Sequence, residues 1–197
     1  LPLALAQPWI ASGQGLTLEM DGTVDARADL RRGRDGRWRG NGRIDSERGA
    51  LRLDDDLERE VFGYRDLAVT VKVEGDAVDG ELSALLPGEG RVSARVRTGL
   101  APTAALSGDL SLDVRDLTWL ELFSEDLAAP VGRLQGQLLL AGTRAQPQLS
   151  GKAALQPFSA ELPALGVKLS EGDFTLVGNA DGTSRLVGSV RSGEGVL

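Results

Sequence analysis

The 197-residue chain contains no cysteine and no histidine. Without cysteine it forms neither disulfides nor thiolate metal sites, and without histidine it lacks the commonest general acid or base and the commonest transition-metal ligand. Catalytic sites of the Ser-His-Asp and Cys-His types are therefore excluded. Paired carboxylates remain as possible catalytic groups, but Glu81, Asp109 and Asp113 lie among other polar groups on the predicted solvent-facing side. We expect no enzyme, no cofactor and no metal.

The chain also lacks a basic excess and long apolar runs. Lys and Arg number 22 against 29 Asp and Glu, which gives a net charge of -7. Nucleic-acid binding normally needs the opposite balance, so we expect no nucleic-acid partner. No apolar run approaches the roughly 20 residues of a membrane-spanning helix. The opening LPLALAQPW has no basic region and too short an apolar stretch for a signal peptide.

Apolar and polar residues alternate over most of the chain, which is typical of half-buried β-strands. Leu67, Val69, Val71 and Val73, for example, alternate with Ala68, Thr70, Lys72 and Glu74. Turn-forming dipeptides separate such rows: Asp21-Gly22, Asp35-Gly36, Gly75-Asp76, Pro87-Gly88 and Asp181-Gly182. These signals favour short hairpins. We therefore predict an all-β, mostly antiparallel meander of about a dozen strands, with one apolar and one polar face.

Two segments interrupt the alternation. Residues 116–127, DLTWLELFSEDL, place apolar residues at helical spacing behind a possible Asp cap, which predicts a short amphipathic helix. Residues 54–62, DDDLEREVF, are a weaker candidate for a helical turn or loop. Neither segment is accompanied by a Pro/Gly/Ser-rich linker, so we expect one domain over residues 1–197.

Glycines recur in the middle of the apolar rows. The pattern apolar-x-Gly-x-apolar is centred on Gly80, Gly108, Gly136, Gly151 and Gly188. Glycine packs nothing, and inside a strand it marks a bulge, a bend or a close approach. We interpret these glycines as bends that fold the sheet into a trough, and close packing against an opposing sheet is the alternative. Aromatic residues make up only 4% of the chain, which favours the trough because a sandwich core usually contains more aromatic filler.

The C-terminal half resembles a known family. GRLQGQLLLAGTRAQPQLSGKAALQ, LPALGVKLSEGDFTLVG and RLVGSVRSGEG resemble the C-terminal region of TamB, within the AsmA-like, bridge-type lipid-transfer proteins of Gram-negative bacteria. DLTWL (Asp116–Leu120) ahead of these stretches also resembles the family. The resemblance is clearest over residues 112–197, whereas residues 1–111 match the family only in their alternation of apolar and polar residues.

The resemblance implies a β-taco, which is a U-shaped sheet that is hydrophobic inside and polar outside. It also implies a periplasmic location, an inner-membrane anchor in a parent protein, and an outer-membrane Omp85-type barrel partner, TamA. We therefore interpret the chain as one section of a larger protein that spans the periplasm. The implied function is a non-enzymatic phospholipid conduit of the translocation and assembly module, serving outer-membrane biogenesis.

Two alternatives to the conduit stay open. One is a chaperone-like groove that assists the assembly of outer-membrane proteins or autotransporters by strand pairing, with unfolded outer-membrane proteins as partners. The other is a closed structural β-module, in which the apolar rows form an ordinary filled core.

The candidate site is the set of inward-facing apolar residues, which we expect to line a lipid groove. They are Leu67, Val69, Val71, Val73, Leu82, Val92, Val96, Leu106, Leu110, Leu112, Leu134, Leu138, Leu140, Leu149, Leu155, Phe174 and Leu176. The groove-bend glycines are the five named above. Trp119, Leu120 and Phe123 in the predicted helix are expected either to plug the groove or to cap one of its edges.

Two charged segments are interpreted as solvated. Asp54, Asp55, Asp56, Glu58 and Glu60 lack the spacing and the glycine of an EF-hand loop, so they are read as an acidic loop and not as a calcium site. RRGRDGRWR (Arg31–Arg39) surrounds an Asp-Gly turn. Its arginines are interpreted as solvated, with contact to lipid headgroups or an acidic partner as the alternative.

Overall fold

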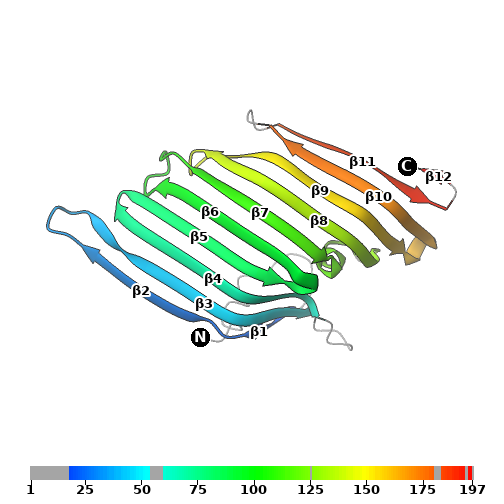
Figure 1. Cartoon of the computed structure of the whole chain (residues 1–197), viewed down its shortest axis with the longest axis horizontal. Coiled ribbons are helices and arrows are strands. Elements are labelled where there is room, and N and C mark those ends of the chain that lie inside the picture. Colours follow the sequence, from blue (N-terminus) through cyan, green and yellow to red (C-terminus); the bar gives the residue numbers. More distant parts are fainter. Residues whose placement is uncertain (1–17, 54–59, 125, 180–182, 194, 197) are drawn as a thin grey trace.

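The computed structural model describes residues 18–53, 60–124, 126–179, 183–193 and 195–196. Twelve β-strands form one antiparallel sheet that is open and curved like a taco (Figure 1). The predicted all-β meander of about a dozen strands is therefore confirmed. Because the sheet is open, the alternative of a closed module with a filled core does not fit the fold.

The strands follow one another along the chain with short connections. They are β1 (Leu18–Gly22), β2 (Asp25–Arg32), β3 (Trp38–Leu53), β4 (Glu60–Gly75), β5 (Ala77–Leu86), β6 (Gly90–Gly99), β7 (Ser107–Asp116), β8 (Ala128–Gly142), β9 (Pro147–Leu162), β10 (Val167–Gly178), β11 (Ser184–Ser192) and β12 (Gly195–Val196). In the part of the chain that the structure describes, short 3₁₀-helices connect some of them: η2 (Pro87–Glu89), η3 (Thr118–Phe123) and η4 (Pro163–Leu165).

From β3 to β12 each strand pairs with the next one in sequence, whereas β1 and β2 both pair with β3. β1 pairs with residues 49–53 and β2 with residues 38–45, so the two short strands lie end to end along one long partner. The hairpin predicted at Asp21-Gly22 is therefore wrong. Gly22 ends β1 with φ 127°, and the chain continues into β2 without folding back.

Other predicted turns are found where the sequence placed them. Asp35-Gly36 joins β2 to β3, Gly75-Asp76 joins β4 to β5, and Pro87-Gly88 lies in η2 between β5 and β6. Gly75 adopts φ 66°, a left-handed conformation that glycine tolerates without steric cost. The predicted turn at Asp181-Gly182 lies outside the described residues.

The predicted helix at 116–127 forms as η3, a six-residue 3₁₀-helix. The Asp116 carboxylate accepts hydrogen bonds from the backbone N–H of Thr118 at 3.0 Å and from its hydroxyl at 2.7 Å. This Asx turn, a type that Asp side chains commonly form, marks the end of β7 and the start of η3. Of the weaker candidate at 54–62, residues 54–59 lie outside the described part. Glu60–Phe62 belong to β4, so a helical turn there is wrong.

Register shifts cluster toward the η3 end of the strands. They occur in β4–β5 near Asp66, in β8–β9 near Ala129, and in β9–β10 and β10–β11 near Glu171. These three residues have positive φ values of 51°, 47° and 51°. A bulge bends its strand and increases the local twist, so a line of bulges across the sheet contributes to its curvature.

The described residues contain a small buried core. Ala84, Leu86, Leu117, Phe158 and Ala160 are the buried hydrophobic residues, and Leu117 is only 1% exposed. Leu117, Phe158 and Ala160 form one cluster where η3 packs on the sheet. The Phe158 and Phe174 rings meet edge to face with centroids 5.9 Å apart. Most of the apolar face therefore lies outside any buried core.

Candidate functional site

Strand register aligns the apolar residues in rows that cross the sheet. Row one contains Gly42, Val71, Gly80, Val96, Gly108, Leu140 and Leu149. Row two contains Ile44, Val69, Leu82, Ala94, Leu110, Leu138, Gly151 and Gly178. Row three contains Ala84, Val92, Leu112, Gly136, Ala153, Leu176 and Leu186. Row four contains Val114, Leu134, Leu155, Phe174 and Gly188.

The structure brings the predicted groove residues onto this one face. All but Leu106 lie within strands, and Leu106 immediately precedes β7. None of the seventeen is buried. Val71, Leu149 and Leu176 are 37%, 47% and 38% exposed. A leucine or valine in a filled core would be almost fully buried, so the apolar face is not covered at these three positions.

The repeat glycines differ in what surrounds them. A Cβ on Gly151, whose φ is 119°, would collide with the Gln137 carbonyl oxygen on β8. A Cβ on Gly108 would collide with the Arg95 carbonyl oxygen on β6, and one on Gly188 with the Phe174 ring. A Cβ on Gly136 would lie 3.1 Å from the Ala153 Cβ, whereas one on Gly80 would meet nothing closer than 3.9 Å. Close approach of the neighbouring strand therefore explains some of these glycines and does not explain Gly80.

The η3 segment covers one end of the apolar face. Trp119 and Leu120 pack against the cluster of Leu117, Phe158 and Ala160, together with row-four residues. The side chain of Phe123 lies outside the described part of the structure. η3 also lies beside β4 as well as β8, although three strands separate these two in the sheet. It therefore lies over the apolar face between the β8 side and the β4 side of the sheet.

Four exposed hydrophobic residues belong to this face but are missing from the predicted site. Leu30, Trp38, Ile44 and Leu186 are 53%, 43%, 39% and 68% exposed, and each continues an apolar row or its strand alternation. Sequence could have identified three of them, because Trp38 and Ile44 flank a looser copy of the glycine repeat and Leu186 starts its last copy.

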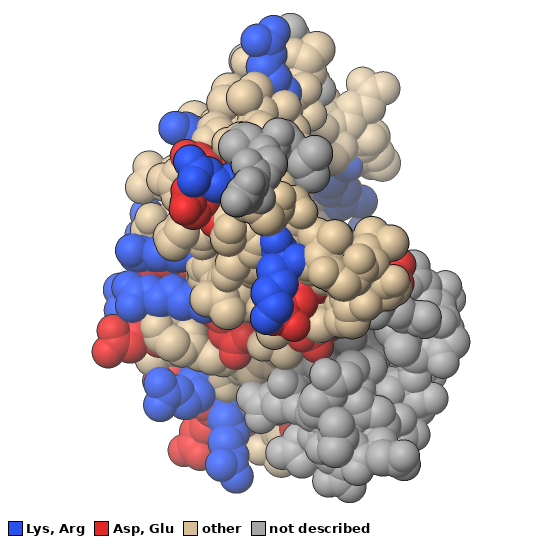
Figure 2. Space-filling model, turned by 90° about the vertical axis from the view of Figure 1, so that its right-hand side faces the viewer, with Lys and Arg blue, Asp and Glu red and all other residues tan. Residues whose placement is uncertain are grey.

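The opposite face carries the charged residues, and most of them lie along one side of the molecule when the sheet is seen edge-on (Figure 2). Ion pairs connect neighbouring strands: Arg97–Asp79 at 2.6 Å, Arg95–Glu81 at 3.7 Å and Arg133–Asp113 at 2.6 Å. Within Arg31–Arg39, Arg31 pairs with Asp29 and Arg39 with Asp35, and all four side chains are exposed. This supports their interpretation as solvated.

Asp113 is the most enclosed carboxylate of these pairs. The Arg133 guanidinium donates hydrogen bonds to both of its oxygens, at 2.8 and 2.6 Å, and Arg115 approaches to 3.7 Å. These hydrogen bonds lower the pKa of Asp113 below its usual range, because they stabilise the ionised form. The lowered pKa keeps Asp113 charged, so it is suited to an ion pair and not to proton transfer.

The carboxylates considered for catalysis are not brought together. Glu81 lies on β5 and Asp109 and Asp113 on β7, with β6 between them, and Arg95 is opposite both Glu81 and Asp109 in the register. Within the described ranges no three acidic side chains gather in a way that could hold a metal ion. The acidic run at 54–60 lies outside the described side chains. No described helix has the length and apolar character needed to cross a membrane.

The fold and the site define a class of protein: an open antiparallel β-sheet with one polar face and one exposed apolar face. A family model described as TamB, N-terminal domain, matches residues 1–155. The chain therefore belongs to the TamB family, as the sequence resemblance indicated. The matched model is that of the N-terminal domain, so the predicted placement in the C-terminal region and the AsmA-like assignment are not confirmed by it. No curated protein and no solved structure matches the chain.

Proposed function

We propose that the apolar face binds the acyl chains of phospholipids, and that the chain forms a section of a lipid conduit between the inner and outer membranes. The observation that carries this proposal is the set of apolar rows one to three, which cross the sheet and whose leucine and valine side chains stay partly exposed. Membership in the TamB family supports a role in the translocation and assembly module, with TamA as outer-membrane partner and the periplasm as location. The proposed role needs no catalytic step.

The dimensions of the face suit acyl chains. Nine strands from β3 to β11, spaced ~4.8 Å apart, give a track of roughly 38 Å. Half of a ~30 Å bilayer core is about 15 Å, so the track is longer than one lipid leaflet. Each buried CH₂ contributes ~0.8 kcal/mol, so a continuous apolar surface holds a chain without specific contacts. A lipid can then move along the track without breaking a directed bond.

The η3 cluster limits where this track runs. Val114, Leu134, Leu155 and Phe174 of row four already pack against the Leu117 cluster. We therefore place the acyl chains along rows one to three, with Trp119 and Leu120 capping the edge formed by row four. In this proposal the segment acts as an edge cap and not as a plug across the whole groove.

Site-specific photo-crosslinking in cells tests the proposal directly. One probe is placed in each of rows one to three, and each has a control probe at the adjacent residue on the polar face: Val71 with Lys72, Leu138 with Gln137, and Leu176 with Thr175. Phospholipid adducts are expected at the apolar positions and not at the controls. Crosslinks from the apolar probes to neighbouring strands alone would count against a lipid track.

Charge substitutions give a second test of the same face. Val71→Asp and Leu138→Arg put a charge into the track, where it would be desolvated by a bound acyl chain. Loss of outer-membrane integrity is expected with a folded chain, whereas the matched variant Gln137→Arg on the polar face should be tolerated. Full integrity with folded Val71→Asp and Leu138→Arg chains would contradict the conduit.

A chaperone-like groove for unfolded outer-membrane proteins remains the second candidate. It is favoured by β11, which pairs with β12 only at Arg191 and Ser192 and exposes Leu186 and Val187. In the described part of the chain, the rest of this edge has no neighbouring strand and could accept one from another chain. This function predicts sensitivity to proline in β11 and tolerance of charges in rows one to three.

A further inference from the structure

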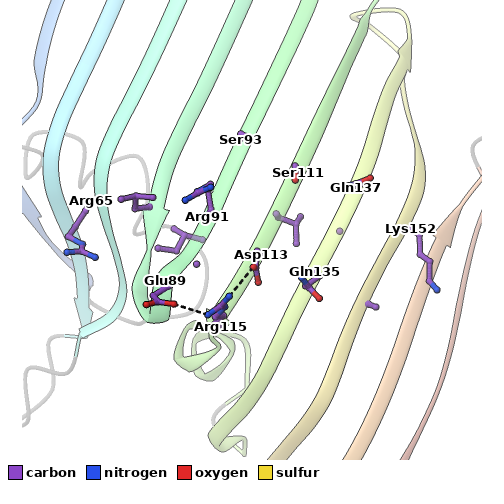
Figure 3. Close-up of a pocket in the computed structure, with 16 residues that line it drawn as sticks. Arg65, Glu89, Arg91, Ser93, Ser111, Asp113, Arg115, Gln135, Gln137 and Lys152 are labelled. Atoms are coloured by element: carbon purple, nitrogen blue, oxygen red, sulfur yellow. Dashed lines mark hydrogen bonds and ion pairs between the residues drawn. The ribbon is translucent and has the colours of Figure 1, made fainter.

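A hollow of about 980 Å³ opens on the polar face, on the opposite side of the sheet from the apolar rows (Figure 3). Its volume lies at the upper end of the ~300–1,000 Å³ range of ligand pockets. Two neighbouring rows of the register supply most of its lining. One row contains Arg65, Leu85, Arg91, Asp113, Gln135 and Ala154. The other contains Ser93, Ser111, Gln137 and Lys152.

Side-chain length explains the shape of the hollow. Ser93 and Ser111 are short and lie next to each other on β6 and β7. Longer side chains surround them (Figure 3). Arg91 lies two residues before Ser93 on β6, and Lys152 lies on β9, two strands beyond Ser111. The floor therefore presents hydroxyl groups, and Gln137 adds an amide donor.

The hollow carries an excess of positive charge. Its two acidic side chains already have partners, because Glu89 pairs with Arg115 at 3.4 Å and Asp113 with Arg133 at 2.6 Å. Figure 3 shows the pairs of Arg115 with Glu89 and with Asp113 as dashed lines. Arg65, Arg91 and Lys152 have no acidic partner among the described residues. This is notable in a chain whose net charge is -7.

These unpaired cations lie at the two ends of the hydroxyl floor. Arg91 on β6 and Lys152 on β9 are three strands apart and two residues apart along the strand direction, which places their backbones roughly 16 Å from each other. Arg65 on β4 lies on the same side as Arg91 and adds a second guanidinium there (Figure 3). A single small anion would satisfy only one end, whereas an anion with two charged groups can satisfy both. Arg guanidinium groups and Lys ammonium groups both bind phosphate well.

We propose that this hollow is a binding site for an anion carrying two phosphate groups. Arg91 and Arg65 contact one phosphate and Lys152 the other, while Ser93, Ser111 and Gln137 donate hydrogen bonds between them. A soluble diphosphate and a bisphosphorylated lipid headgroup present the same chemistry to the site. The site is separate from the apolar track and does not depend on the proposed lipid conduit.

The test is calorimetric titration of the full 197-residue chain with inorganic pyrophosphate at low ionic strength. The site variant is Arg91→Ala/Lys152→Ala. The matched control is Lys72→Ala/Arg95→Ala, which removes the same two charges from the same face but outside the hollow, where Lys72 pairs with Glu74 and Arg95 with Glu81. All four side chains are exposed, and a thermal melt confirms folding of both variants.

Saturable binding to the parent chain, weakened at least tenfold in the site variant and less than twofold in the control, is the expected result. An equal loss in both variants would show a nonspecific charge effect and overturn the proposal, as would the absence of saturable binding to the parent chain. Vesicles of phosphatidylcholine with a bisphosphorylated lipid then separate the two sources. Retention that pyrophosphate reverses identifies a headgroup, and binding of pyrophosphate without retention identifies a soluble anion.

Discussion

The two faces of the sheet are built from alternate residues of the same strands, yet their exposed side chains differ in whether they have suitable partners. On the polar face, side chains such as Arg97 and Asp79 pair with each other across strands and remain in water. On the apolar face, rows one to three have neighbours beside them but no second sheet above them in the described part of the chain. Most charged side chains of the polar face outside the basic hollow are satisfied by ion pairs with their neighbours, whereas the apolar face needs a ligand or partner to be fully buried.

A second difference lies within the apolar face. Row four is covered by Leu117 and its neighbours, and Leu117 is 1% exposed. In row one, Leu149 is 47% exposed. Burial of a side chain sets how much stability its truncation removes, so the covered edge should hold most of the stability of this face and the open rows should hold little. The open rows can then bind a ligand without lowering the stability of the fold.

The largest expected effect is at the covered edge. Leu117→Ala should lower the free energy of unfolding by about 3–4 kcal/mol, because it leaves a cavity in the most buried cluster. Leu149→Ala is the matched substitution in the open row and should cost under about 1 kcal/mol, since this side chain is already half exposed. Denaturant unfolding of the two variants measures the difference. Similar losses for both would mean that the apolar face is uniformly covered in solution.

A smaller effect separates the repeat glycines. Gly151→Ala should cost about 2 kcal/mol, since Gly151 has φ 119° and its Cβ would collide with the Gln137 carbonyl oxygen. Gly80→Ala is the control in the same repeat, because its Cβ would meet Thr70 and Val96 only at ordinary contact distances of 3.9 and 4.0 Å. We expect less than about 0.5 kcal/mol there. If Gly80→Ala proved as costly as Gly151→Ala, both glycines would mark a bend of the whole sheet.

Sequence predicted much of the fold because strands alternate with a period of two. Parity alone assigned Val71, Leu138 and Leu176 to one face, and a strand keeps that assignment as long as no bulge interrupts it. It could not predict that β1 and β2 share β3 as a partner, because a turn signal such as Asp21-Gly22 does not tell how long the paired strands are. It also missed the bulges at Asp66 and Glu171, where residues other than glycine adopt positive φ.

The two candidate sites differ in how far sequence could predict them. The apolar rows follow from each strand separately. The basic hollow combines Arg65 on β4 with Lys152 on β9, and their relation depends on the register of every strand between them. Bulges and strand pairing set that register, so no short sequence motif predicts the site.

The smallest expected effect is on the polar face, at the Asp113–Arg133 pair. Asp113→Asn removes one partner of a partly exposed ion pair, and such pairs contribute roughly 0.2–1 kcal/mol. The pKa of Asp113 is lowered in the folded state by the hydrogen bonds from Arg133, so the pair stabilises the fold above about pH 4, the ordinary range of an Asp carboxyl. This contribution is lost as the pH falls through the lowered pKa.

The stability gap between the parent chain and Asp113→Asn should therefore be full at neutral pH and close in acid, as measured by urea unfolding across this range. Asp109→Asn is the control on the same strand and face, without an ion pair among the described residues, and should lose less at neutral pH. A gap that persisted unchanged in acid would mean that Asp113 stabilises β7 by packing and hydrogen bonding and not by its charge. The polar face would then depend on shape as the apolar edge does, and the contrast between the two faces would weaken.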